Sequence, residues 1–214
     1  MQEPYSELLL LIEIFSSEKR NSMTGRTHDM AAITALSIIA LSHPIPAISI
    51  ATGITAVFAN MLGGIAPDID QPTAPMWRNL PVGRIFGKVF GALIGGHRFV
   101  SHSILGVIIF GVAWHFFLVL LTPSFPHLNM TIIWWAFMIG FISHLIMDTF
   151  TREGVPWLLP IPIKFGLPPT KVFRVVTGGL VERFIIFPAL IAVTLYSLYT
   201  HQKIILDLLH NHIK

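Results

Sequence analysis

The clearest chemical pattern in the chain is H-x-x-x-D, formed by His144 and Asp148. Residues four apart lie on the same face of a helix, so one helix can offer an imidazole and a carboxylate to a single ion. Both residues fall within the apolar stretch 134–150, where an unpaired aspartate is costly. The pattern therefore predicts two metal ligands. The alternative is a private His–Asp hydrogen bond that ties helices together.

A second cluster contains two carboxylates, Asp68 and Asp70, separated by one residue. In an extended segment, side chains two residues apart point to the same side. Neighbouring carboxylates are stabilised by a cation between them, so this pair also predicts a metal site. Asp70, if the ion does not fully engage it, is expected to act as a general base. The alternative is a pair of solvated aspartates at a helix end.

His97 and His102 form a third cluster together with Arg98. On one continuous helix these imidazoles would lie about 140° apart. They can converge if Ser101 caps the following helix and His97 lies in the turn before it. Arg98 could then bind a phosphate or another oxyanion with two parallel hydrogen bonds. The alternative is an ordinary helix cap with flanking polar residues.

His28 stands at the start of the first apolar helix, where a metal ligand and a capping or surface residue are equally good interpretations. His115 lies within an apolar stretch and is expected to be a packed interior residue. Polar residues near the clusters are expected to orient the ligands through hydrogen bonds. These supporting residues are Ser101, Ser143, Glu182 and Arg183.

The composition excludes several classes of protein. Of the 214 residues, 53% are apolar and 12% are charged, and the mean hydropathy is +0.71. Soluble domains carry roughly 25% charged residues, so an ordinary soluble globule and a disordered chain are both excluded. The chain has no cysteine, which excludes disulfides, thiolate metal sites and cysteine nucleophiles. The net charge of +3 is spread thinly, so no nucleic-acid partner is expected.

Apolar runs of about 20 residues predict an all-α polytopic membrane bundle with about five membrane helices and peripheral amphipathic helices. The first is short unless its polar flank, 24–29, extends it as a buried helix. Residues 1–22 are expected to form an extension or a surface helix, 23–200 the membrane-embedded domain and 201–214 an amphipathic tail. The five predicted membrane helices are 30–42, 47–65, 101–122, 131–150 and 183–200.

The positive charges predict the orientation of the bundle. Twelve of the 14 Lys and Arg residues lie before the first helix or in the long connections 66–100 and 151–183. Cytoplasmic segments are enriched in these residues, so the N-terminus and both connections are expected in the cytoplasm. All four polar clusters then lie near the cytoplasmic interface. The connection 151–175 is rich in proline and apolar residues, which is typical of a segment that lies on the membrane or lines a groove.

The clusters, taken in order, resemble the YdjM-like, LexA-regulated family of membrane-bound metal-dependent hydrolases of prokaryotes. The core is also similar to the helical zinc-dependent phospholipase C class. The resemblance implies hydrolysis of a phosphoester and a location in the inner membrane of a prokaryote. The segments that carry it are His28, APDIDQP at 66–72, GHR at 96–98, SHS at 101–103, GFISH at 140–144 with Asp148, GVP at 154–156 and ERF at 182–184.

We therefore expect a membrane hydrolase in which a divalent ion activates water for attack on a lipid or lipid-linked phosphate. Nitrogen and oxygen ligands without thiolates favour zinc, with manganese or iron as alternatives. Arg98 would neutralise charge that develops on the phosphoryl group. A non-catalytic membrane regulator with a structural metal or His–Asp cluster is the main alternative, and a transporter the weaker one. The expected ligands are His28, Asp68, Asp70, His97, His102, His144 and Asp148.

Overall fold

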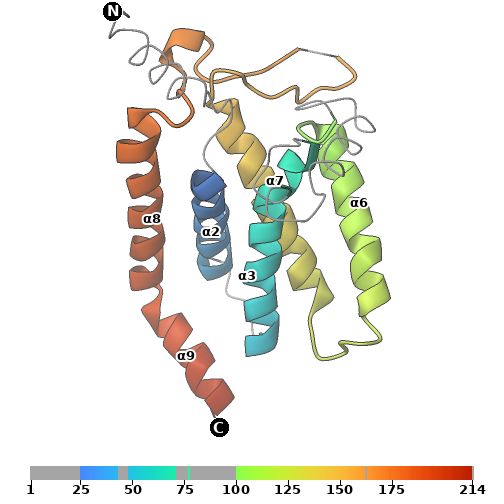
Figure 1. Cartoon of the computed structure of the whole chain (residues 1–214). Coiled ribbons are helices and arrows are strands. Elements are labelled where there is room, and N and C mark those ends of the chain that lie inside the picture. Colours follow the sequence, from blue (N-terminus) through green and yellow to red (C-terminus); the bar gives the residue numbers. More distant parts are fainter. Residues whose placement is uncertain (1–24, 43–47, 71–76, 78–99, 162, 214) are drawn as a thin grey trace, which may run out of the picture.

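The computed structural model describes residues 25–42, 48–70, 77, 100–161 and 163–213, without the side chains of Asp70 and 208–213. No described residue belongs to a β-strand, and the predicted all-α class is confirmed. Figure 1 shows the helices side by side. Their bounds are α2 Gly25–Ser42, α3 Ile50–Ile65, η1 Ala66–Asp70, α6 Ile104–Leu121, α7 Met130–Thr149, η2 Lys171–Phe173, η3 Glu182–Ile186, α8 Phe187–Thr200 and α9 Gln202–Ile213.

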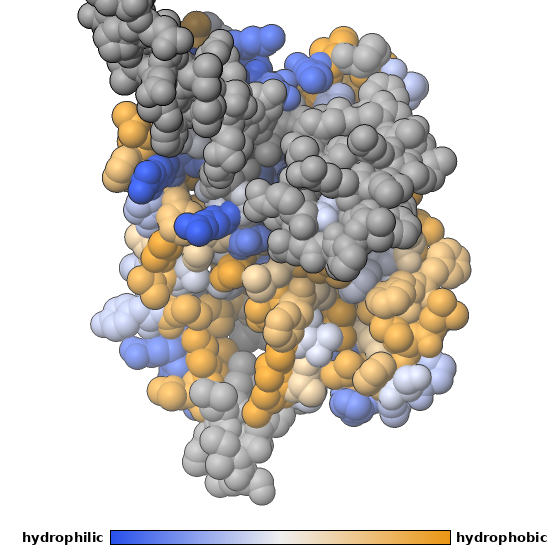
Figure 2. All heavy atoms as spheres, viewed as in Figure 1, coloured by the Kyte–Doolittle hydropathy of each residue, from blue (hydrophilic) through white to orange (hydrophobic). Residues whose placement is uncertain are grey.

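Four of the helical segments are long and apolar enough to cross a membrane: 50–69, 104–121, 130–149 and 182–200. They agree with four of the five predicted spans to within a few residues. The face of the molecule in Figure 2 carries mainly apolar residues between its two ends, as lipid contact requires. Half of the apolar stretch of α7 is buried, compared with 17% for α6 and 11% for α8. α7 is therefore the central helix, and α6 and α8 are peripheral.

The fifth predicted span is α2, which is not among these four candidates. It begins at Gly25, so the polar flank does extend it, and it runs for 18 residues. It packs against α3, α7 and α8, and its buried residues include Thr27 and His28. The neighbouring helices cover Thr27 and His28, so these two polar side chains do not face lipid.

The contact between α3 and α7 depends on two glycines. A Cβ atom at Gly63 would collide with the backbone carbonyl of Phe137, and one at Gly140 with the carbonyl of Asn60. The Asn60 side chain also donates a hydrogen bond to the Ala136 carbonyl at 3.0 Å. Small residues let membrane helices approach closely, and here they bring the two backbones into direct contact.

The connections alternate between the two ends of the bundle (Figure 1). The helix ends that carry the polar clusters therefore meet at one end. That end holds the start of α2, the end of α3 with η1, the start of α6 and the end of α7. α9, where the sequence predicts an amphipathic tail, continues from α8 at the other end.

We expect Gly140→Ala to destabilise the bundle because the new methyl group forces α3 and α7 apart. Overpacking of this kind costs about 1–3 kcal/mol. Gly53→Ala is the matched control, because no atom lies within 4 Å of a Cβ at Gly53 and alanine favours a helix more than glycine does. Thermal unfolding in detergent should show a lower Tm for Gly140→Ala and an unchanged or higher Tm for Gly53→Ala. Equal Tm values would contradict the proposed contact.

Candidate metal centre

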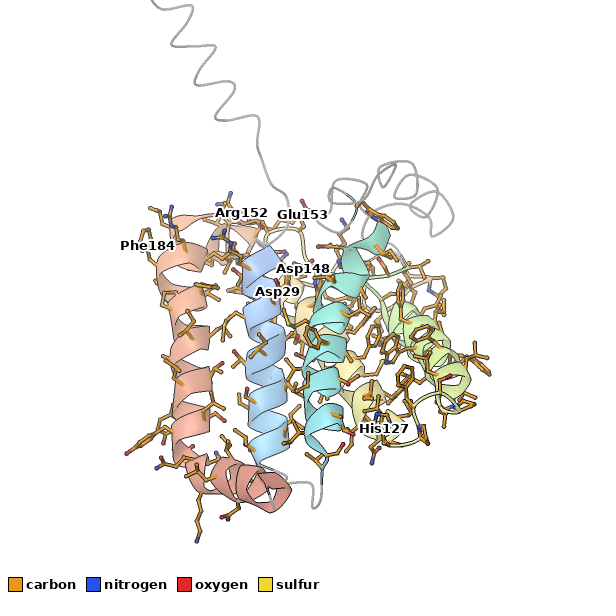
Figure 3. All side chains as sticks on the ribbon, turned by 60° about the horizontal axis from the view of Figure 1, so that its bottom comes forward. Asp29, His127, Asp148, Arg152, Glu153 and Phe184 are labelled. Atoms are coloured by element: carbon orange, nitrogen blue, oxygen red, sulfur yellow. The ribbon has the colours of Figure 1, made fainter. Side chains whose placement is uncertain are left out.

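Five predicted ligands from four separate elements meet at one end of the bundle. Four of them, His28, His102, His144 and Asp148, are at most 1% exposed, whereas the Asp68 side chain is 14% exposed. The potential ligand atoms form two sets of three that could each hold a metal ion, and both sets include His144. One set is His28, His144 and Asp148, and the other is Asp68, His102 and His144. Figure 3 shows Asp148 at the end of the bundle opposite the loop residue His127.

The protonation of His144 follows from its backbone partner. Its Nδ1 lies 2.6 Å from the carbonyl oxygen of Gly64. A carbonyl can only accept a hydrogen bond, so Nδ1 carries the proton and a neutral ring has its lone pair on Nε2. This Nε2 is buried and has no hydrogen-bond partner among the described residues. A lone pair in this position is available to a cation.

The atoms that face His144 Nε2 are themselves acceptors. Asp68 Oδ1 lies 3.7 Å away and Asp148 Oδ2 lies 3.8 Å away. These separations exceed the 2.7–3.2 Å range of normal N–H···O hydrogen bonds. A lone pair that faces two carboxylate oxygens is repulsive unless a positive charge lies between them. The geometry therefore fits a shared cation better than a set of direct hydrogen bonds.

His102 completes a ring of four donor atoms. Its Nε2 lies 3.5 Å from Asp148 Oδ2 and 3.7 Å from Asp68 Oδ1. Ligands about 2.0–2.2 Å from a tetrahedral ion are separated by roughly 3.3–3.6 Å. The four separations in the ring, from 3.5 to 3.8 Å, come close to these values. The ligand atoms of Asp68, His102 and His144 are mutually close, as are those of His28, His144 and Asp148, so His144 is common to two groups that could each hold an ion.

His28 lies on the other side of Asp148. Its Nε2 is 3.5 Å from Asp148 Oδ1, so the two carboxylate oxygens face different imidazoles. The His28 and His144 rings are stacked, with centroids 3.8 Å apart and an angle of 13° between their planes. Two positive charges at this separation would repel strongly in a dry interior, so the stacking favours neutral rings. Neutral imidazoles are the form that binds metal.

Hydrogen bonds from the surroundings orient the ligands. Ser101 Oγ lies 2.9 Å from His102 Nδ1, and the Gly64 carbonyl oxygen lies 2.6 Å from His144 Nδ1. Trp77 donates to the carbonyl of Ile69 at 2.9 Å, next to Asp68. Sequence reasoning missed the role of Gly64, although the Gly63-Gly64 pair signals a close backbone approach. Partners of this kind fix the ring orientation of metal-binding histidines.

The other supporting residues occupy different places. Glu182 is buried, accepts a hydrogen bond from Thr27 Oγ1 at 2.6 Å and another from the backbone N–H of Gly178 at 2.7 Å. It therefore joins the start of η3 to the first turn of α2, beside His28. Ser143 donates to the Gly140 carbonyl within its own helix. Arg183 is exposed and lies over the ring of Phe184, at 5.5 Å from its centroid.

Three sequence-based expectations need correction. Ser103, not Ser101, is the N-cap of α6, and its hydroxyl accepts from the Gly106 N–H. Asp68 and Asp70 lie in a 3₁₀ turn, not in an extended segment, because Pro67 continues the helical path of α3. His115 lies exposed on α6 and not in the interior. His97, Arg98 and the side chain of Asp70 lie outside the described residues.

We expect purified wild-type protein to contain zinc, manganese or iron, and His144→Ala to lose it, because Nε2 contributes the central nitrogen ligand. The affinity should fall by more than the roughly 10–100-fold that follows loss of an outer hydrogen-bond partner. His127→Ala, at the far end of the bundle, is the matched control and should retain metal. Elemental analysis of both variants measures the difference. Equal metal content in both would rule out His144 as a ligand.

Asp68→Asn serves as a second variant, because this partly exposed carboxylate is easier to replace than a fully buried ligand. It should also bind metal more weakly, without the loss of folding that His144→Ala could cause. A folded Asp68→Asn protein with wild-type metal affinity would contradict a ligand role for Asp68.

Comparison with known proteins supports the predicted family. Residues 23–204 match the family described as YdjM inner membrane protein. YvsG of Bacillus subtilis is 30% identical over 178 residues, which cover 83% of this chain and 93% of that protein. The inner membrane protein YdjM of Escherichia coli is 31% identical over 129 residues, 56% of each chain. No solved structure matches. The chain is therefore a member of the YdjM inner membrane protein family.

Proposed function

We propose that this protein is a metal-dependent hydrolase that cleaves a phosphoester of a lipid or a lipid-linked phosphate at the membrane surface. The observation that carries the proposal is the buried Nε2 of His144, which faces the carboxylate oxygens of Asp68 and Asp148 at 3.7 and 3.8 Å. The resemblance of the sequence motifs to membrane-bound metal-dependent hydrolases supports the proposal.

The donor set fits a divalent transition metal. Two to three imidazoles with two carboxylates are suited to zinc, and manganese or iron would bind the same groups. Calcium prefers six to eight oxygen ligands and would not use the histidines. When bound, such an ion supplies Lewis acidity and lowers the pKa of a coordinated water molecule.

The protein's own residues would divide the remaining tasks. His102, His144 and Asp148 are fully enclosed and hold their positions through the helices, whereas Asp68 reaches the edge of the cluster. Among the described ligands, Asp68 is thus the one most accessible to water that enters the site. Asp70, next in the same turn, is proposed as the general base, and Arg98 as the group that neutralises charge on the phosphoryl oxygens.

The depth of the cluster suggests the class of substrate. The ligands lie where α3 and α7 end and where α2 and α6 begin, so they are close to one end of the membrane-spanning segments. The phosphate of a lipid lies at this level, with its acyl chains beside the apolar faces of the helices. Following the distribution of Lys and Arg, we assign this end to the cytoplasm.

A structural metal site is the second candidate function. The observation that favours it is the nearly closed ring of four donors, because structural zinc sites use four protein ligands and catalytic sites use three with an open position. In that case the ion would hold α7, η1 and the start of α6 together in a membrane regulator.

The test is hydrolysis of a phosphodiester by zinc- or manganese-loaded protein, assayed with a chromogenic diester and with phospholipid in mixed micelles. We expect turnover in the wild type and at least about a 100-fold loss in Asp148→Asn, which disturbs the contacts of three imidazoles. Asp207→Asn, an exposed aspartate of α9, is the matched control and should keep full activity. Stoichiometric metal without turnover on either substrate would favour the structural site.

A further inference from the structure

The chain between α7 and η3, residues 150–181, folds into a defined lobe that we call the 150–181 lobe; residue 162 lies outside the described part. Val155 and Phe165 exchange two backbone hydrogen bonds, of 2.8 and 2.9 Å. The N–H of Val175 donates to the Phe150 carbonyl at 3.0 Å, and that of Arg152 to the Val175 carbonyl at 3.2 Å. These bonds hold the segment in one conformation, so the positions of its side chains are determined by the fold.

The interior of this lobe is small. Val155 is fully buried, and the guanidinium group of Arg174 donates to the carbonyls of Pro168 and Pro169 at 2.7 and 2.9 Å. Trp157 is anchored to the helical bundle by a hydrogen bond from its Nε1 to Thr149 Oγ1 at 2.9 Å. With backbone and guanidinium groups in the middle, little space remains for apolar side chains.

Large apolar side chains therefore lie on the outside of the lobe. Val172 and Phe173 are 75% and 76% exposed. An apolar surface of this extent is unusual on a protein part that faces only water, and it marks a site of contact with membrane or protein. The other large exposed apolar residues of the lobe are Phe150, Leu158, Ile161, Ile163, Phe165, Leu167, Val176, Leu180 and Val181.

Basic residues accompany this apolar surface. Lys164 and Lys171 are both exposed, and Lys171 directly precedes Val172 and Phe173. The lobe contains four basic residues and a single acidic residue, Glu153. Apolar side chains combined with lysines are typical of elements that lie at a membrane interface, because the apolar groups enter the acyl boundary and the ammonium groups meet lipid phosphates. A protein partner would not require this combination.

The location of the lobe agrees with such a surface. Figure 1 shows the segment beyond the ends of α6 and α7, where it crosses the end of the bundle. Its Trp157 carbonyl accepts from the N–H of Ile104, the first residue of α6. Backbone that is neither helical nor in a closed sheet cannot lie in the hydrocarbon core, so the headgroup layer is the level at which this lobe can contact lipid.

We infer that the 150–181 lobe is a membrane-surface element that immerses Val172, Phe173 and their apolar neighbours in an anionic lipid leaflet. Lys164 and Lys171 contact the lipid phosphates. The lobe begins two residues after Asp148, whose carbonyl accepts from Thr151 Oγ1 at 2.8 Å, so it would hold headgroups beside the His–Asp cluster. The inference does not depend on the metal or on any catalytic activity.

Spin labelling tests this inference directly, because the chain has no cysteine and each introduced cysteine is unique. Val172→Cys and Phe173→Cys are labelled in the full chain, reconstituted in vesicles of phosphatidylglycerol and phosphatidylethanolamine. Collision rates with oxygen, which concentrates in lipid, are compared with those of a water-soluble nickel chelate. Phe116→Cys on α6 gives the deep-lipid reference, and Ser124→Cys in the loop after α6 gives the water reference; both positions are exposed.

We expect the oxygen-to-nickel ratio at 172 and 173 to be several-fold higher than at 124 and shifted toward the value at 116. In vesicles of phosphatidylcholine alone, the ratio should fall, because the lysines lose their anionic partners. A ratio at 172 and 173 equal to that at 124 would overturn the inference. Low collision rates with both reagents would also overturn it, because protein and not lipid would then cover the lobe.

Discussion

The structure depends most on the surroundings of one carboxylate, that of Asp148. It lies in the last turn of the central helix, fully buried, with one oxygen facing His28 and the other facing His102 and His144. A negative charge in this place is tolerable only if cationic or proton-donating groups compensate it. Three imidazoles from three elements surround it, and their spacing from the carboxylate oxygens fits a shared ion. The elements α2, α6 and α7 are therefore tied together at one end of the bundle by a polar cluster, not by apolar packing alone.

The close contact of α3 with α7 makes this cluster possible. Without side chains at Gly63 and Gly140, the two backbones approach closely enough for the Gly64 carbonyl to accept the proton of His144 Nδ1. That hydrogen bond determines which nitrogen of His144 has a lone pair available to a cation. A packing feature in the membrane thus controls the chemistry of the site. The Gly63-Gly64 pair signals a close approach already in the sequence, but only the packing shows that α7 is the helix that approaches it.

The 150–181 lobe connects this chemistry with the lipid surface. It leaves α7 directly after Asp148 and caps the start of α6 through the Trp157 carbonyl. A lobe with an apolar, basic exterior, attached to the rim of a candidate metal-binding cluster, suits an enzyme whose substrate stays in the membrane. It would equally position a structural metal centre at the membrane interface.

Much of this protein can be predicted from its sequence. The apolar runs predict the helices, because a membrane span is recognisable from length and composition alone, and H-x-x-x-D places His144 and Asp148 on one face because helical periodicity is local. The family also follows from short motifs. Tertiary structure decided the rest. Only the packing of helices shows that His28, Asp68 and His102 meet His144, that Gly64 orients it, and that Ser103 instead of Ser101 caps α6. These contacts join residues far apart in the chain, and local sequence carries no information on the distance between such groups.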